Sequence, residues 1–218
     1  MNLKEINKLT IGTYKKVANK YHENFKDEML HKDFDRAILD EFSKHITKPG
    51  LICDAGCGPS GHIGKYLQQN GYNIIGIDIS PDCIDIARGY ENDIQFIEMD
   101  MMNTSFELDK FDGIISFYSI IHTPKKDVSK IIKEFNRILK PNGRVLIVIK
   151  KGDEEGIVSD DWYDGNEIYF STFTENELKS YFVMNGFEIE HVETRAPYDS
   201  EIDVERIYLI AKKVKSPG

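Results

Sequence analysis

One short stretch of the chain combines a carboxylate with three glycines in a spacing that suits a nucleotide-like ligand. Asp54 ends a short apolar run, and Gly56, Gly58 and Gly61 follow it closely. Glycine tolerates positive φ and lacks a Cβ atom, so a ligand can approach the backbone. A helical pattern starts at His62, and the free N–H groups of a helix N-terminus would point at such a ligand. The stretch therefore predicts a strand, a glycine-rich turn and a helix that together bind a cofactor.

The glycines alone do not decide which cofactor binds. Their spacing fits G-x-G-x-x-G, the pattern of dinucleotide sites. Asp54 disfavours a dinucleotide because a carboxylate repels a pyrophosphate, whereas it would attract a ligand with sulfonium and ammonium groups. Asp78 ends the next apolar run, where a carboxylate can bind both ribose hydroxyls of either cofactor. A nicotinamide-dependent oxidoreductase is therefore one alternative at this point.

The elements that would position these residues alternate between strands and helices. A helix over 124–140 carries an apolar stripe and ends at the Pro141-Asn142-Gly143 turn. Five short β-branched runs have the composition of buried parallel strands: Leu51–Ala55, Asn73–Ile77, Ile94–Glu98, Gly113–Tyr118 and Val145–Ile149. Such alternation predicts a parallel sheet with helices on both faces.

The end of the chain departs from this alternation. A helix over 175–185 begins at Thr174 with Glu177 three residues later, which is a capping-box pattern. Residues 187–194 and 206–212 then follow as two strands with no helix between them, so we expect an antiparallel pair. The predicted fold is therefore a Rossmann-like α/β fold: a seven-stranded, mostly parallel sheet with an antiparallel C-terminal hairpin. It leaves no separate catalytic domain, which further disfavours an oxidoreductase.

Five motifs in order resemble those of class I S-adenosylmethionine-dependent methyltransferases. The resemblance covers roughly residues 45–212, and no single motif would be specific. In chain order they are the glycine-rich motif (Asp54–Gly58), the ribose-binding acid (Asp78), the adenine-binding motif (Glu98–Met101), the fourth strand with its following loop (Phe111–Ser119) and the turn before strand five (Leu139–Gly143).

The resemblance implies S-adenosylmethionine as cofactor and S-adenosylhomocysteine as co-product. It assigns Asp54 to the amino group of the methionine part, Asp78 to the ribose and Asp100 to the adenine amine. The Met101 backbone N–H would donate to the adenine ring, and Ile79 would pack on its face. The remaining cofactor contacts that it implies come from Gly56, Cys57, Gly58 and Phe117.

One histidine is the candidate catalytic residue. Many small-molecule methyltransferases that the chain resembles have a histidine at the position of His122, just past the fourth strand. An imidazole titrates near neutral pH and can take a proton from a hydroxyl or an amine. The alternative is a histidine that only braces the loop. Phe117 and Tyr118 would lie beside the departing methyl group, unless they simply belong to the core.

Two segments are candidate lids over the site. We expect residues 1–45 to form an N-terminal helical lid and 46–218 to form the cofactor-binding domain. Tyr14 and Tyr21 lie seven apart on one helical face, where they would contact the substrate or pack on the domain. Within 152–170, Trp162 and Tyr163 would form an aromatic wall of a substrate lid. Seven acidic residues and no Lys or Arg lie between 152 and 167, which favours a neutral or cationic substrate; the alternative is a solvated loop.

Composition narrows the class of protein. The 218 residues carry a net charge of −9, which disfavours non-specific binding to nucleic acids. No signal peptide or membrane-spanning run is visible, and three cysteines indicate reduced thiols in a cytoplasm. Cys53 and Cys57 have no partner pair to complete a metal site, so no metal is expected.

The predicted function is therefore methyl transfer to an oxygen or nitrogen atom of a small-molecule acceptor by a cytoplasmic monomer or homodimer. Neither nucleic acids nor membranes are expected partners. Three alternatives remain at this point: a protein or RNA methyltransferase, a nicotinamide-dependent oxidoreductase, and a non-catalytic protein that kept the fold.

Overall fold

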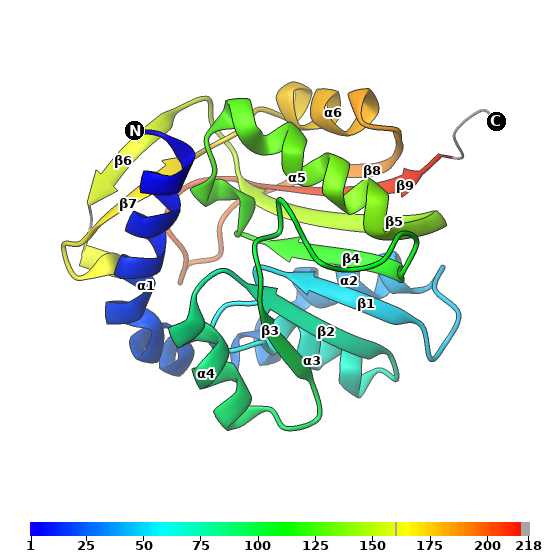
Figure 1. Ribbon diagram of the computed structural model, residues 1–218, viewed down its shortest axis with the longest axis horizontal. Helices are drawn as coiled ribbons and strands as arrows, with labels where there is room; N and C mark the ends of the chain where they lie inside the picture. The colour runs from blue at the N-terminus through cyan, green and yellow to red at the C-terminus, as the bar shows by residue number, and fades with distance from the viewer. Residues whose placement is uncertain (160, 215–218) are drawn as a thin grey trace.

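The computed structural model describes residues 1–159 and 161–214, and a seven-stranded sheet forms its centre (Figure 1). The strands are β1 (Leu51–Ala55), β2 (Asn73–Asp78), β3 (Gln95–Glu98), β4 (Phe111–Phe117), β5 (Leu139–Lys150), β8 (Phe187–Arg195) and β9 (Arg206–Lys213). Their order in the sheet is β3-β2-β1-β4-β5-β9-β8. Strands β1 to β5 are parallel, and β9 is antiparallel to both β5 and β8. The predicted mixed sheet with an antiparallel C-terminal hairpin is thus confirmed.

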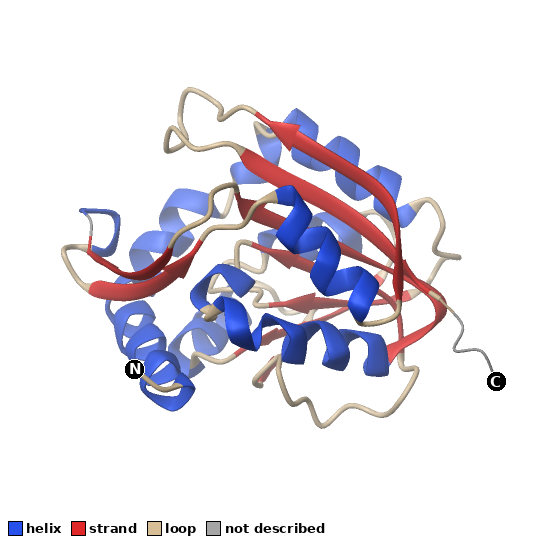
Figure 2. Cartoon of the chain, turned by 90° about the horizontal axis from the view of Figure 1, so that it is seen from above, coloured by secondary structure: helices blue, strands red, loops and turns tan. Residues whose placement is uncertain are grey.

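Helices cover both faces of the sheet (Figure 2). One face carries α2 (Asp33–Ser43), α3 (His62–Gln69) and α4 (Pro81–Tyr90), and the other carries α5 (Lys125–Ile138) and α6 (Glu175–Met184). The stripe on α5 packs into the core because Val128, Ile131 and Phe135 are fully buried. Within the described residues, no helix has the length and apolar composition needed to cross a bilayer.

Two helix ends have different causes, one local and one tertiary. Thr174 and Glu177 form the predicted capping box, in which the Glu177 N–H donates to the Thr174 hydroxyl and the Thr174 N–H donates to the Glu177 carboxylate. Helix α5 ends at Ile138, two residues earlier than predicted. The reason is tertiary, because Leu139 already pairs with Phe111 in the sheet.

The N-terminal helix and a small hairpin form one cap at the end of the sheet. The cap consists of α1 (Leu3–Phe25) and the segment 155–171, which holds β6 (Glu155–Ser159), a 3-10 turn (Asp161–Tyr163) and β7 (Glu167–Ser171). Figure 1 shows α1 beside β7, and the Thr13 hydroxyl donates to the Glu167 carbonyl at 2.6 Å. The antiparallel β6–β7 pair was not predicted. Asp160, which belongs to the predicted 152–170 lid, lies outside the described residues.

The predicted lid over residues 1–45 consists of two parts with different surroundings. Only α1 belongs to the cap, whereas α2 packs against the sheet. Leu39 and Phe42 of α2 are fully buried in the same apolar cluster as Ile52 of β1 and Ile115 of β4. Helix α2 is therefore part of the globular core.

Candidate active site

A first cavity, at the carboxyl ends of β1, β2 and β4, brings together residues from four separate motifs. Strand β1 lies between β2 and β4, and such a switch in strand order is where open α/β sheets bind ligands. All nine residues predicted to bind the cofactor line this cavity: Asp54, Gly56, Cys57, Gly58, Asp78, Ile79, Asp100, Met101 and Phe117.

Two glycines of the turn after β1 are needed for different reasons. Gly56 has φ +79°, and a Cβ atom there would lie 2.2 Å from the Cβ of Ser119. Gly58 has φ +60°, and the nearest atom to a Cβ there would be Cε1 of Tyr21 at 3.9 Å. Gly56 therefore permits close packing of two loops, whereas Gly58 leaves its side of the turn open to a ligand.

Three carboxylates of the first cavity are fixed by backbone N–H groups. Asp54 is 2% exposed and accepts a bond from the Gly64 N–H at 3.1 Å, and its burial raises its pKa to about 7. Asp78 accepts from the Gly58 N–H at 3.0 Å, and burial raises its pKa as well. Asp100 accepts from the Met102 N–H at 2.8 Å. Each carboxylate keeps further lone pairs for a ligand.

The lining of the first cavity is strongly acidic. Glu28 and Asp35 join the three aspartates, and no Lys or Arg is found among the described residues that line it. This arrangement favours a ligand with positive charge and disfavours one with a pyrophosphate. Sequence reasoning missed both Glu28 and Asp35, because they come from the N-terminal segment and belong to no motif.

The cysteines beside the first cavity are buried thiols. Cys53 and Cys57 are free and buried, and burial raises the pKa of both thiols. Across 1–159 and 161–214, no three or more His, Cys, Asp or Glu side chains gather in a way that could hold a metal ion.

His122 is buried beside the first cavity and bonded at both ring nitrogens. Its Nδ1 lies 2.9 Å from the carbonyl oxygen of Tyr169, and its Nε2 lies 3.1 Å from the hydroxyl of Tyr14. A carbonyl only accepts, so Nδ1 carries the proton and Nε2 accepts from Tyr14. Burial lowers the pKa of His122 to about 4, which keeps the imidazole neutral at pH 7.

A second cavity of about 500 Å³ adjoins the first. The two cavities share part of their lining, namely Glu28, His122 and three tyrosines, Tyr14, Tyr21 and Tyr118. Trp162 and Tyr163 line only the second cavity. All five residues predicted to contact the substrate therefore line the second cavity.

Tyr118 stands at the border between the two cavities. It has φ +50°, a left-handed conformation that is uncommon for a residue with a side chain. This backbone conformation follows directly after β4 and directs the tyrosine toward both cavities.

Within the described residues, the predicted 152–170 lid does not give the second cavity an acidic lining. The second cavity is not lined by any described acidic residue of 152–170; Asp164, for example, pairs with Lys20 at 2.5 Å. Its charged lining comes instead from Glu28, Lys32, Lys150 and two residues beyond β8, Glu201 and Arg206. Sequence reasoning missed these last two, since nothing local marks them as site residues.

Comparison with known proteins agrees with this geometry. A family model described as "Methyltransferase domain" matches residues 52–143, which run from β1 to β5. The chain is 25% identical over 139 residues to sterol 24-C-methyltransferase of Saccharomyces cerevisiae, covering 61% of this chain and 34% of that protein. It is 32% identical over 115 residues to the chloroplastic tocopherol O-methyltransferase of Arabidopsis thaliana, covering 50% of this chain and 32% of that protein. The chain thus spans about a third of the length of these curated relatives.

Solved structures share the fold over nearly the whole chain. The 1,6-didemethyltoxoflavin-N1-methyltransferase of Burkholderia thailandensis, solved with bound S-adenosylhomocysteine, has a TM-score of 0.68 and 16% identity. The match covers 94% of this chain and 88% of that one. The motifs in order, the observed strand order and the match of a methyltransferase family model over 52–143 together support the class I S-adenosylmethionine-dependent methyltransferase family.

Proposed function

We propose that the protein is an S-adenosylmethionine-dependent methyltransferase that acts on an oxygen or nitrogen atom of a small molecule. The observation that carries this proposal is the acidic lining of the first cavity. Asp54, Asp78 and Asp100 line it with no Lys or Arg among its described residues, whereas the further carboxylates Glu28 and Asp35 pair with cations outside the lining, Lys32 and Arg195. S-adenosylmethionine presents a sulfonium and an ammonium group to such a lining, whereas NAD presents a pyrophosphate that the carboxylates repel.

The residues of the first cavity fit the parts of this cofactor. Asp54 would bind the amino group of the methionine part, Asp78 the ribose hydroxyls and Asp100 the adenine amine. Met101 would donate its N–H to the adenine ring, and Ile79 would pack on the face of that ring. Gly56, Cys57, Gly58 and Phe117 would complete the contacts. When bound, the cofactor supplies an electrophilic methyl group.

The Tyr14–His122 pair suits removal of a proton from the acceptor. The acceptor O–H or N–H would give its proton to the oxygen of Tyr14 while Tyr14 gives its own proton to Nε2 of His122. The carbonyl of Tyr169 would stabilise the resulting imidazolium through its bond to Nδ1. Holding the acceptor in line with the methyl group would supply much of the remaining rate enhancement.

A small acceptor suits the second cavity. Its volume of about 500 Å³ lies in the range of small-molecule sites. The two curated relatives named above also act, by their names, on small molecules: one on a sterol carbon and one on a tocopherol oxygen. The net charge of −9 argues against RNA as acceptor, because RNA binding needs basic surface.

Turnover with a mixed acceptor pool tests the proposal. The protein would be incubated with methyl-labelled S-adenosylmethionine and separate small-molecule, protein and RNA fractions of a cell extract. We expect label in the small-molecule fraction, with one S-adenosylhomocysteine formed for each labelled product. Label only in protein or RNA, or no label in any fraction, would contradict the proposal.

A further inference from the structure

The second cavity has an aromatic end built by the cap. Tyr21 and Phe25 of α1 have ring centroids 4.4 Å apart, and the ring of Trp162 lies 5.1 Å from Phe25 and 6.2 Å from Tyr21. All three side chains line the cavity. They form one wall from two segments that are far apart in the chain, next to the Tyr14 hydroxyl.

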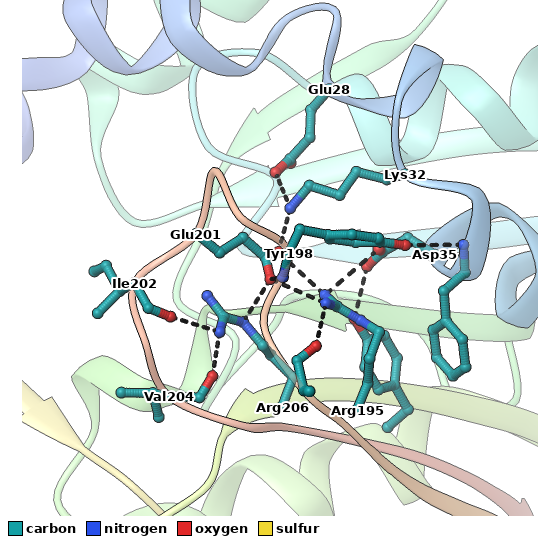
Figure 3. Close-up of polar contacts among 12 residues, drawn as sticks. Glu28, Lys32, Asp35, Arg195, Tyr198, Glu201, Ile202, Val204 and Arg206 are labelled. Carbon is teal, nitrogen blue, oxygen red and sulfur yellow. Dashed lines mark hydrogen bonds and ion pairs between the residues drawn. The ribbon is translucent and has the colours of Figure 1, made fainter.

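The second cavity also has charged lining residues, and their charges are balanced. We name Glu28, Lys32, Glu201 and Arg206 the ion cluster; it is drawn in Figure 3. Lys32 pairs with Glu28 at 2.9 Å and also with Glu201. Nε of Arg206 lies 3.2 Å from Glu201. Arg195 also pairs with Glu201 at 3.0 Å and with Asp35 at 3.8 Å, so three cations and three carboxylates balance one another around the ion cluster.

The ion cluster is held in place from behind. Arg195 of β8 donates to both carboxylate oxygens of Glu201, at 3.0 and 3.1 Å, and its guanidinium lies 3.9 Å from the ring centroid of Tyr198. The side chains of Lys32, Glu201 and Arg206 are only 10%, 8% and 4% exposed. A cluster with so little solvent and so many partners cannot readily turn a charge toward a new ligand.

This balance disfavours a charged acceptor. A carboxylate in the cavity would face Glu28 and Glu201, and an ammonium group would face Lys32 and Arg206. In either case a charge would be desolvated without a free partner, which is costly. The further cation of the lining, Lys150, lies over the ring of Phe170 at 4.7 Å.

An uncharged flat ring has no such cost and gains contact with the aromatic wall. Aromatic rings prefer offset or edge-to-face neighbours at about 4.5–7 Å between centroids. The rings of Tyr21, Phe25 and Trp162 are tilted against one another by 53–68°, so they offer a flat ring both faces and edges to pack against, and Tyr14 offers a hydroxyl beside them.

We propose that the acceptor is an uncharged, planar aromatic ring that carries a hydroxyl group. Its ring lies on the wall of Tyr21, Phe25 and Trp162, and its hydroxyl lies at Tyr14. The balanced ion cluster selects against charged acceptors. This inference rests on the proposed function and names the substrate class of the same site.

Calorimetry with the protein saturated by S-adenosylhomocysteine tests the inference by binding alone. The probes are 2-naphthol, its saturated counterpart decahydro-2-naphthol, the anion 6-hydroxy-2-naphthoate and the cation choline. We expect 2-naphthol to bind at least ~10-fold more tightly than each of the others. Equal binding of the saturated alcohol, tighter binding of either ion or no binding of 2-naphthol would overturn the inference.

The same titrations separate this inference from the proposed function. Failure of S-adenosylhomocysteine to bind in the first step counts against the proposed function. Its binding, followed by the wrong order of probes, counts only against the acceptor class. Trp162→Leu should weaken the binding of 2-naphthol about 10-fold. Tyr66→Leu, on α3 and outside both cavities, should leave this binding unchanged. An unchanged affinity in Trp162→Leu would contradict the aromatic wall.

A charge change in the ion cluster should shift the selectivity. Glu201→Gln leaves the positive charges of Lys32 and Arg206 in excess. The affinity for 6-hydroxy-2-naphthoate should therefore rise about 10-fold, while the affinity for 2-naphthol should change less than about threefold. Lys32→Gln leaves a carboxylate in excess, so the affinity for choline should rise instead. Thermal unfolding checks that each variant folds, and either folded variant decides the question. Unchanged affinities for 6-hydroxy-2-naphthoate in Glu201→Gln and for choline in Lys32→Gln would overturn the role of the ion cluster.

Discussion

The hydroxyl of Tyr14 on α1 lies 3.1 Å from Nε2 of His122, which follows β4. The other ring nitrogen of His122 lies 2.9 Å from the Tyr169 carbonyl in the β6–β7 hairpin. The cap thus supplies partners for both nitrogens of this histidine. The proposed proton relay exists only when α1 and the hairpin are in place over the sheet.

Tyr14→Phe and His122→Asn should each lower kcat by about 10²-fold, because each removes one step of the relay. The dissociation constant of S-adenosylhomocysteine should change less than about threefold, since cofactor binding belongs to the carboxylates. The double variant should be no slower than the slower single one, as expected for residues that act as a unit. Steady-state kinetics and calorimetry measure both quantities, with Tyr66→Phe as the matched control. Additive losses would argue for two independent roles.

The pH dependence of kcat provides a second test of the Tyr14–His122 pair. The pKa of His122 is about 4, so its imidazole is already neutral throughout the range above pH 5. We therefore expect no inflection near pH 6.5 in kcat, but a loss of activity as the pH falls toward 4. An inflection near 6.5 that disappears in His122→Asn would show that the histidine titrates as an ordinary solvated imidazole.

Asp54→Asn should stabilise the folded protein and weaken cofactor binding. Burial raises the pKa of Asp54 from 3.8 to about 7. Between these two pH values, the folded protein therefore keeps a proton that the unfolded chain has released. Stability therefore falls as the pH rises from about 4 to 7, and the neutral asparagine avoids this loss. We expect the variant to unfold a few degrees higher at pH 8 and to match the unaltered protein at pH 3.5.

The same substitution should weaken the binding of S-adenosylhomocysteine at least ~10-fold, because the ammonium group of this ligand no longer meets a carboxylate at position 54. Calorimetry at pH 8 measures this loss, and differential scanning calorimetry measures the stability. Unchanged affinity together with raised stability would mean that Asp54 does not contact the cofactor.

Gly56→Ala should unfold more easily and lose cofactor binding. The residue has φ +79°, and a new Cβ would lie 2.2 Å from the Cβ of Ser119. The matched control is Gly12→Ala, because Gly12 is exposed in the middle of α1 and a Cβ there meets nothing within 4 Å. The control should be stabilised by about 0.5–1 kcal/mol through helix propensity. Urea denaturation of both variants gives the comparison, and equal effects would contradict the role assigned to Gly56.

Glu201→Gln should destabilise the protein at pH 7 by about 2–3 kcal/mol, since it leaves buried cations without their shared partner. Burial alone would raise the pKa of Glu201, but hydrogen bonds from Arg195 and Lys32 outweigh it and hold the pKa at about 2. The stabilisation is therefore present above pH 4.5 and is lost as the pH falls from 4.5 to 2. Chemical denaturation at pH 7 and at pH 2 should show a difference only at the higher pH. An equal difference at both values would mean that the carboxylate charge is not responsible.

The sequence was most informative where one continuous motif determines both the fold and the chemistry. Asp54, Gly56 and Gly58 lie in one turn after β1, so strand, turn and acid could be predicted together. Asp78 could be placed because acids at the carboxyl ends of neighbouring parallel strands meet at one edge of the sheet. The apolar stripe of α5 was likewise visible from its helical spacing.

The rest of the site depends on pairing between distant segments. Lys32 and Glu201 are 169 positions apart, and neither belongs to a motif. Strand β6 is exposed along most of its length, so it lacks the apolar alternation that marks a strand. The ion cluster and the hairpin therefore became visible only in three dimensions.

Titration of the protein with S-adenosylhomocysteine and, separately, with NADH tests the central claim most directly. The acidic first cavity predicts one-to-one binding of S-adenosylhomocysteine, weakened at least ~10-fold by Asp78→Asn, and no binding of NADH. Binding of NADH with no response to S-adenosylhomocysteine would contradict the account.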